Sequence, residues 1–144
     1  MGLRTRIEVR GYELDSLGHV NHAVYHQYAE VARMKAFVAA GCEWDELARR
    51  RIGPVLLSTT VNFRSELRGN DVVDVSCVAK FGTGKTFTLE QEITKVDGTL
   101  SAEVYGVFGV MDLDARKLFA DPRAALESTG LDVSVLLAEP PSRT

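Results

Sequence analysis

The chain has 144 residues, enough for one domain with a sizeable core, and its 45% hydrophobic and 26% charged residues are ordinary for a globular protein. The net charge of −3 and the scattered basic residues argue against nucleic acid as a partner, because phosphate binding needs a concentrated basic face. No segment approaches the roughly 20 apolar residues of a membrane span, and no apolar run follows the N-terminus, so we expect a cytoplasmic protein without a signal peptide.

The first part of the chain predicts a strand, a loop and a long helix. Alternating apolar residues indicate a half-buried strand over 4–10, and a polar loop follows over 11–20. Over 21–40 the pattern is helical, with Asn21 as the N-cap and Gly41 just past the end. Apolar residues at spacings of three and four form a narrow stripe, against which a sheet should pack closely. The stripe consists of Tyr25, Ala29, Ala32, Ala36 and Ala40.

After a short helix over 44–51, the period changes to two, which is typical of strands. Turn residues separate long alternating segments, so we expect an antiparallel meander. One more short helix is expected near 121–128. The predicted strands cover 55–64, 71–81, 86–96 and 101–111. In the first of these, the residues predicted to share one face are Val55, Leu57, Thr59, Val61 and Phe63.

These elements predict an α+β domain, in which a five-stranded antiparallel sheet covers one long helix. We expect a single domain over 1–144, with its core at about 4–128 and a C-terminal tail at about 129–144. Cys42 and Cys77 lie in segments of different type, so we expect two reduced, buried thiols. The second face of the sheet also carries apolar residues, so we expect a homo-oligomer that extends the sheet at an edge or stacks two faces. Those residues are Val72, Val78, Tyr105 and Val107.

The most informative segment precedes the long helix: Asp15-Ser16-Leu17-Gly18-His19-Val20-Asn21-His22, followed by Tyr25. Together with the order of elements and with Asn62-Phe63-Arg64 and Gly69-Asn70-Asp71, it resembles the hotdog-fold thioesterases of the 4-hydroxybenzoyl-CoA thioesterase-like branch. The resemblance implies a hotdog fold and hydrolysis of acyl thioesters of coenzyme A or acyl carrier protein. It also implies that there is no metal or bound cofactor, and that a homodimer or homotetramer has its active sites at the subunit interface.

The resemblance also implies roles for individual residues. Asp15 falls where the family has its catalytic aspartate, acting as nucleophile or general base, and His22 falls where a backbone N–H polarises the thioester carbonyl. His19 matches a histidine of the related plant acyl-carrier-protein thioesterases, whereas Leu17 stands where those enzymes have asparagine. From chemistry alone, hydrolysis needs a nucleophile or activated water and a stabilised oxyanion. Asp15 and the N-terminus of the helix at Asn21 supply these two requirements.

Each of these residues also has a structural interpretation. Asp15 is alternatively a loop cap, His19 an anchor for the loop, and Asn21 only a helix cap. His19, His22 and His26 have the spacing of a metal site on a helix, but no nearby cysteine completes a ligand set, so we predict no metal.

Four further residues are predicted to bind substrate. Tyr25 is expected to form the pocket wall. Arg64, Arg68 and Lys85 lie at strand ends and turns, where they would meet the phosphates of coenzyme A, although solvated surface charges are the alternative.

Two other functions compete with the thioesterase. A hotdog-fold dehydratase or hydratase usually presents a His and an acidic residue in a different local motif, which this chain lacks. A non-enzymatic acyl-thioester-binding protein would regulate a partner, and an attached DNA-binding domain would favour it.

Overall fold

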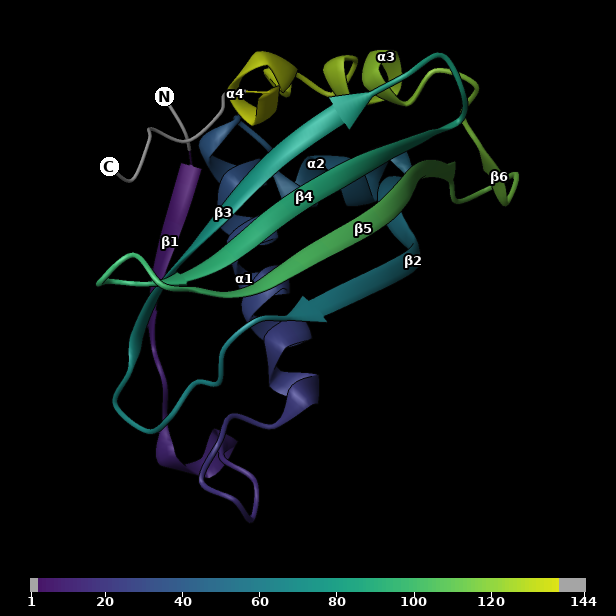
Figure 1. Ribbon diagram of the computed structural model, residues 1–144. Helices are drawn as coiled ribbons and strands as arrows, with labels where there is room; N and C mark the ends of the chain where they lie inside the picture. Colours follow the sequence, from purple (N-terminus) through teal and green to yellow (C-terminus); the bar gives the residue numbers. More distant parts are fainter. Residues whose placement is uncertain (1–2, 138–144) are drawn as a thin grey trace.

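One long helix packs against one face of an antiparallel sheet in the computed structural model, which describes residues 3–137 (Figure 1). The strands are hydrogen-bonded in the order β1-β3-β4-β5-β2, and a short β6 pairs with β5. The predicted α+β arrangement is therefore confirmed. The strands are β1 (Leu3–Glu8), β2 (Ile52–Phe63), β3 (Val72–Phe81), β4 (Thr86–Lys95), β5 (Leu100–Asp112) and β6 (Lys117–Leu118). The helices are the 3-10 turn η1 (Gly11–Glu13), α1 (His22–Ala39), α2 (Trp44–Arg50), α3 (Pro122–Glu127) and α4 (Val133–Leu137).

The long helix α1 begins at the residue that the sequence marks as its cap. The side-chain oxygen of Asn21 accepts a hydrogen bond from the Ala23 N–H at 3.0 Å, which satisfies one of the unpaired donors of the first turn. Gly41 follows the helix with a φ of 94°, a left-handed conformation that glycine adopts without strain. The predicted stripe is buried along its whole length, and four of its five members are alanines, so the sheet backbone can approach closely. Its members are Tyr25, Ala29, Ala32, Ala36 and Ala40.

The helix-facing sides of β3, β4 and β5 follow the predicted alternation. Gln91 interrupts the apolar pattern of β4, yet it is buried, and its amide donates a hydrogen bond to the Ala29 carbonyl of α1 at 2.9 Å. A polar group at this depth is tolerated because it is paired. The apolar positions around it are buried as predicted and include Val73, Val75, Leu89, Ile93, Ala102, Val104 and Val110.

The edge strand β2 departs from simple alternation. A bulge between Leu56 and Ser58 shifts its register against β5. Leu56 lies opposite the buried Phe108, so Leu56 shares the inner face with Thr59, Val61 and Phe63, while Val55 lies opposite Gly109 on the other face. The predicted common face for Val55 through Phe63 was therefore wrong at Val55, and Leu57 is the bulge residue, which has no partner in β5. One inserted residue reverses the alternation, and a period-two count cannot reveal it.

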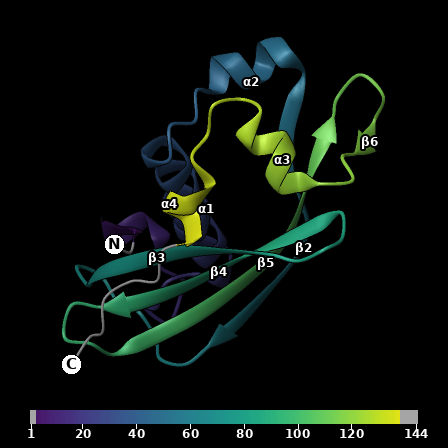
Figure 2. The ribbon, with the colours of Figure 1, turned by 90° about the horizontal axis from the view of Figure 1, so that it is seen from above.

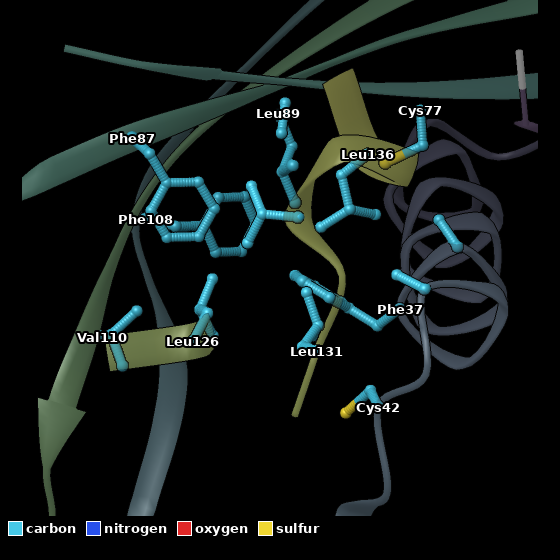
Figure 3. Packing of buried hydrophobic residues seen from close by; sticks show 14 of the residues in the cluster. Phe37, Cys42, Cys77, Phe87, Leu89, Phe108, Val110, Leu126, Leu131 and Leu136 are labelled. Carbon is cyan, nitrogen blue, oxygen red and sulfur yellow. The ribbon is translucent and has the colours of Figure 1, made fainter. Parts of the chain in front are cut away.

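Aromatic rings and the last two helices close one end of the molecule. Figure 2 shows α1, α2, α3 and α4 on one side of the sheet. The ring of Phe87 stacks on Phe108 with 5.8 Å between centroids, and Leu136 of α4 is fully buried in the same cluster (Figure 3). The sequence predicted neither α4 nor β6. Because α4 packs into this cluster, the core extends beyond residue 128. Cys42 and Cys77 are free and buried here, as predicted.

The outer face of the sheet is crossed by ion pairs. Arg6 pairs with Asp74 at 3.0 Å, and Lys80 pairs with Glu90 at 3.2 Å. The apolar residues predicted for this face are thus interspersed with charges, which disfavours stacking two such faces. Within residues 3–137, no helix combines the length and the apolar character needed to cross a bilayer.

Candidate active site

A tight loop presents Asp15 just before α1, below the sheet in the view of Figure 1. Leu14 and Val20 form an isolated antiparallel bridge, so the loop returns on itself. Inside it, the Asp15 N–H donates to the His19 carbonyl at 2.7 Å, and the Gly18 N–H donates to the Asp15 carbonyl at 3.1 Å. Gly18 has a φ of 79°, which glycine tolerates at this turn. The loop is therefore held by its own backbone.

The Asp15 carboxylate is exposed and fixed by backbone donors. It accepts hydrogen bonds from the N–H groups of Leu17 at 2.8 Å and His19 at 3.2 Å. These two bonds hold the pKa of Asp15 below its ordinary value, because they favour the charged form. Asp15 is thus a carboxylate at neutral pH, available as a base or nucleophile and not as an acid.

A carboxylate from a distant segment contacts His19. The Nε2 of His19 lies 2.7 Å from an oxygen of Glu66, and the other Glu66 oxygen lies 2.9 Å from Arg68. The hydrogen bond from Arg68 lowers the pKa of Glu66, with His19 adding to the effect. A carboxylate on one imidazole nitrogen fixes the orientation of the ring.

Glu66 was missed by the sequence analysis. It lies in the segment after β2, which reaches the loop because His19 and Arg68 form a bridge and the Val20 N–H donates to the Leu67 carbonyl at 2.8 Å. The only sequence signal is its position between Arg64 and Arg68, the two cations already suspected.

The first turn of α1 leaves one backbone donor available. Asn21 caps Ala23 with its side chain, and its carbonyl accepts from the Val24 N–H at 2.9 Å. Within the described part of the chain, the His22 N–H has no hydrogen-bond partner. The positive end of the helix dipole also lies at this position. This arrangement suits a ligand oxygen that carries negative charge.

These groups surround one open pocket. Its wall includes Tyr25, whose ring meets Phe63 edge-on with centroids 5.0 Å apart. Tyr25 is buried, and burial raises the pKa of its hydroxyl. The tyrosine is therefore neutral and serves as an apolar wall with one polar tip. The residues that line the pocket are Asp15, His19, Val20, His22, Tyr25, Phe63, Arg64, Ser65 and Glu66.

The remaining predicted residues lie at or beyond the border of this pocket. The Asn21 side chain caps α1 by accepting a hydrogen bond from the Ala23 N–H. Arg68 does not line the pocket and forms an ion pair with Glu66. Lys85 lies in the β3–β4 turn, close to where Phe81 pairs with Phe87, at the opposite end of the sheet from Asp15. Within one chain, the structure does not bring Lys85 to the pocket.

The buried carboxylate of Glu13 stabilises the segment next to the pocket. Glu13 accepts hydrogen bonds from the Arg10 backbone at 2.8 Å, the Arg10 guanidinium at 2.7 Å and the Tyr28 hydroxyl at 2.5 Å. Burial alone would raise the pKa of Glu13, but these bonds outweigh it and hold the pKa below its ordinary value. The Glu13 carbonyl also accepts from the Asn21 N–H at 2.9 Å, so this network anchors the start of α1.

The histidine spacing does not assemble a metal centre. Over residues 3–137, no group of three or more His, Cys, Asp or Glu side chains is placed to hold a metal ion.

Comparisons with known proteins show the family of this chain. The family model described as the thioesterase-like superfamily matches residues 9–132. The long-chain acyl-CoA thioesterase FadM of Escherichia coli (strain K12) is 29% identical over 120 residues, which cover 82% of this chain and 89% of that protein. The chloroplastic acyl-acyl carrier protein thioesterase ATL3 of Arabidopsis thaliana is 38% identical over 65 residues, 45% of this chain and 34% of that protein.

Solved structures share the fold. The probable thioesterase YbaW from Escherichia coli superposes with a TM-score of 0.80 at 26% identity, covering 94% of this chain and 99% of that chain. The protein SAV2348 from Staphylococcus aureus, solved in complex with CoA, superposes with a TM-score of 0.83 over 99% of this chain and 89% of that one. At 18% identity, the second likeness shows the fold alone.

Proposed function

Because the chain belongs to the thioesterase-like superfamily, as a hotdog-fold acyl-CoA thioesterase, we propose that Asp15 and the first N–H of α1 carry out thioester hydrolysis. One observation carries this proposal: an exposed carboxylate with a lowered pKa shares a pocket with His22, whose N–H has no partner within residues 3–137. A carboxylate activates the attacking group, and a helix N-terminal N–H stabilises the oxyanion.

The reaction balances by either of two routes. As a general base, Asp15 takes a proton from water while the water oxygen bonds to the thioester carbon. The carbonyl oxygen then becomes an oxyanion that the His22 N–H stabilises, and collapse expels the thiolate. As a nucleophile, Asp15 bonds to the carbon itself and expels the thiolate, and water then cleaves the resulting anhydride. Both routes yield a free acid and a thiol.

The contact between His19 and Glu66 supports a positioning role for this pair. Glu66 orients the imidazole, and the His19 backbone N–H in turn holds the Asp15 carboxylate. Fixing the carboxylate in the direction of the substrate avoids reorganisation in the transition state. His19 is then both the loop anchor considered from sequence and a contributor to the rate.

Arg64 and Arg68 are the cations best placed to meet the phosphates of coenzyme A or of a carrier-protein arm. Both guanidinium groups are more than half exposed, and each is paired with a carboxylate, Glu103 for Arg64 and Glu66 for Arg68. Exposed pairs are weak, so a phosphate competes readily for these donors. Lys85 would contribute only to the pocket of a second copy.

The free edge of β2 is where we propose that a second copy binds. Among the described strands, β2 pairs only with β5, so its other edge is open, and the bulge residue Leu57 is exposed there. An open edge with apolar side chains favours pairing with another chain. The charged outer face makes edge pairing the better of the two predicted modes. A homodimer, a higher oligomer and a cytoplasmic location stay predictions.

The test is release of free thiol from acyl-CoA substrates of graded chain length, with and without a chelator. Asp15→Asn keeps the size of the side chain and removes its charge. The expected loss of kcat is at least about 100-fold, the low end of what general-base catalysis contributes. The matched control is Asp45→Asn in the first turn of α2, which lies outside the pocket.

Near wild-type kcat in Asp15→Asn would make Asp15 structural. Activity that disappears with a chelator and returns with zinc would contradict the metal-free mechanism. Tight binding without any thiol release would favour the non-enzymatic alternative.

A further inference from the structure

The middle of α1 holds a charge that the fold does not explain. Arg33 is half-buried, and its guanidinium lies over the ring of Phe108 at 5.2 Å from the centroid. Its hydrogen bond to the Gln91 side-chain oxygen is long, at 3.3 Å. Among residues 3–137, no carboxylate forms an ion pair with Arg33. Burial lowers the pKa of Arg33, and the nearby carboxylate of Glu30 counteracts this desolvation only in part.

The donors of Arg33 remain available at the surface. A guanidinium carries five N–H groups, and the described structure uses one of them. Within the described residues, no fully buried side-chain nitrogen or oxygen lacks a partner, so the remaining Arg33 donors reach open space. The group is therefore ready to bind an anion.

The surface that Arg33 reaches is the uncovered inner face of β2. Arg33 lies over Phe108, and Leu56 is the cross-strand neighbour of Phe108, with 48% of its surface exposed. At the other end of the same face, Phe63 is 54% exposed and contacts Tyr25 in the proposed active site. A strip of β2 that is apolar except at Thr59 thus leads from the site toward Arg33.

The strands give the length of this strip. Ala102 and Phe108 of β5, the partners of Phe63 and Leu56, are six residues apart, and a rise of about 3.3 Å per residue gives about 20 Å. An extended long acyl chain spans this distance. Its thioester would lie at the Asp15 end, and its far end would lie at the guanidinium.

Resting on the thioesterase function proposed above, we propose that Arg33 selects acyl thioesters whose far end carries a carboxylate, which it binds with its free donors. The methylene chain lies on Leu56, Val61 and Phe63, and the carboxylate forms a bidentate pair with the guanidinium. A purely apolar chain would leave a half-buried cation unpaired, whereas an anionic end neutralises it.

The experiment compares long-chain monothioesters of dicarboxylic acids with methyl-ended acyl-CoAs of the same length. The measured quantity is the ratio of their kcat/KM values. We expect the wild type to prefer the carboxylate-ended substrate, and Arg33→Met to lower the ratio by at least about tenfold, as for loss of a charged hydrogen bond. Arg33→Lys should retain part of the preference. The control Arg123→Met, in an exposed ion pair of α3, should leave the ratio unchanged.

A second arm separates this inference from the thioesterase function. Calorimetry with non-hydrolysable thioether analogues of the two ligands reports the Arg33 preference without any hydrolysis. Thiol release from both substrates with no Arg33-dependent preference would overturn the inference and leave the function intact. Absence of thiol release, with the binding preference retained, would overturn the function alone. A ratio unchanged in Arg33→Met, together with a lost oligomer, would assign Arg33 to a contact with a second copy.

Discussion

The two ends of α1 are packed in different ways. Around its C-terminal half, Phe37 and Phe108 lie in a cluster closed by α2, α3 and α4 (Figure 3). Around its N-terminal half, the cluster includes Tyr28 and Leu67 but borders buried polar groups and an open pocket. One end is sealed by apolar contacts, and the other is held by hydrogen bonds.

This difference separates stability from chemistry. Apolar contacts do not depend on a particular bond angle, whereas hydrogen bonds do. The hydrogen bonds therefore fix the loop of Asp15 and the start of α1 in one geometry. A catalytic carboxylate needs the second kind of support. We therefore expect substitutions at the sealed end to change mainly the free energy of unfolding, and substitutions at the open end to change mainly the rate.

The largest expected effect on stability is at the sealed end. Phe87→Ala removes a ring that is 1% exposed and stacks on Phe81 and Phe108. Deleting a buried phenylalanine costs about 3–5 kcal/mol of the free energy of unfolding. Urea unfolding measures this loss, and kcat per folded molecule should change little.

Phe63→Ala is the matched control for Phe87→Ala. Its ring is 54% exposed, so the stability cost should be smaller while the effect on substrate binding is larger. Equal stability losses for the two phenylalanines would contradict the distinction between a sealed and an open end.

The next largest effect on stability is expected from the hydrogen bonds of Glu13 with Arg10 and Tyr28. Glu13→Gln removes the charge that Arg10 and Tyr28 share, and a buried hydrogen bond to a charged group contributes about 1.5–3 kcal/mol. Because the folded-state pKa of Glu13 is lowered, its contribution is present above the unfolded pKa of about 4.3 and is lost as pH falls through the folded pKa. The stability difference between wild type and Glu13→Gln should therefore shrink below about pH 4.

Unfolding curves of both proteins at pH 7 and at pH 3.5 measure this difference. Glu30→Gln, an exposed position on the same helix, is the control and should show no such trend. A difference that stays constant with pH would mean that the Glu13 charge is not what supports the start of α1.

Local patterns in the sequence predicted most of the fold. Alternation placed Val73, Leu89 and Val104 on the buried face, and Asn21 marked the start of α1. These features depend on neighbours a few residues away, which a sequence shows directly. The β2 bulge and the five-residue α4 were missed, because each is decided by contacts with distant segments.

The candidate site shows the same limit. Asp15, His19, His22 and Tyr25 come from one continuous segment, and all four line the same pocket in the structure. Glu66 reaches His19 only through long-range pairing, so its role required the structure. Likewise, the lengths of β3 and β4 place the turn that carries Lys85 at the end of the sheet away from Asp15.

A smaller effect should follow from separating Glu66 from His19. Glu66→Gln keeps the shape and removes the charge that orients the imidazole. Losing one supporting partner typically costs about 10-fold to 100-fold at a metal site, and we expect about tenfold in kcat here, with KM nearly constant. Steady-state kinetics measure this split.

His19→Ala combined with Glu66→Gln distinguishes a pair from two separate residues. If Glu66 acts through His19, the double variant should be no slower than His19→Ala alone. Additive losses would place Glu66 in direct contact with the substrate, and the proposed positioning role would be abandoned.

The smallest effect is expected at the exposed cations. Arg64→Ala and Arg68→Ala each remove a donor that we assign to substrate phosphates, and exposed ion pairs contribute only about 0.2–1 kcal/mol. KM should rise about two- to fivefold, and its dependence on salt concentration should become weaker. The kcat should stay nearly unchanged, because the lost interaction binds the ground state and the transition state equally. Arg116→Ala, in the turn before β6, is the control at a distant exposed position.

Lys85→Ala sharpens the comparison of the two ends. Its turn lies at the end of the sheet away from Asp15, so a rise in KM there requires a second copy to carry Lys85 to the pocket, whereas an unchanged KM leaves each pocket to the cations of its own chain.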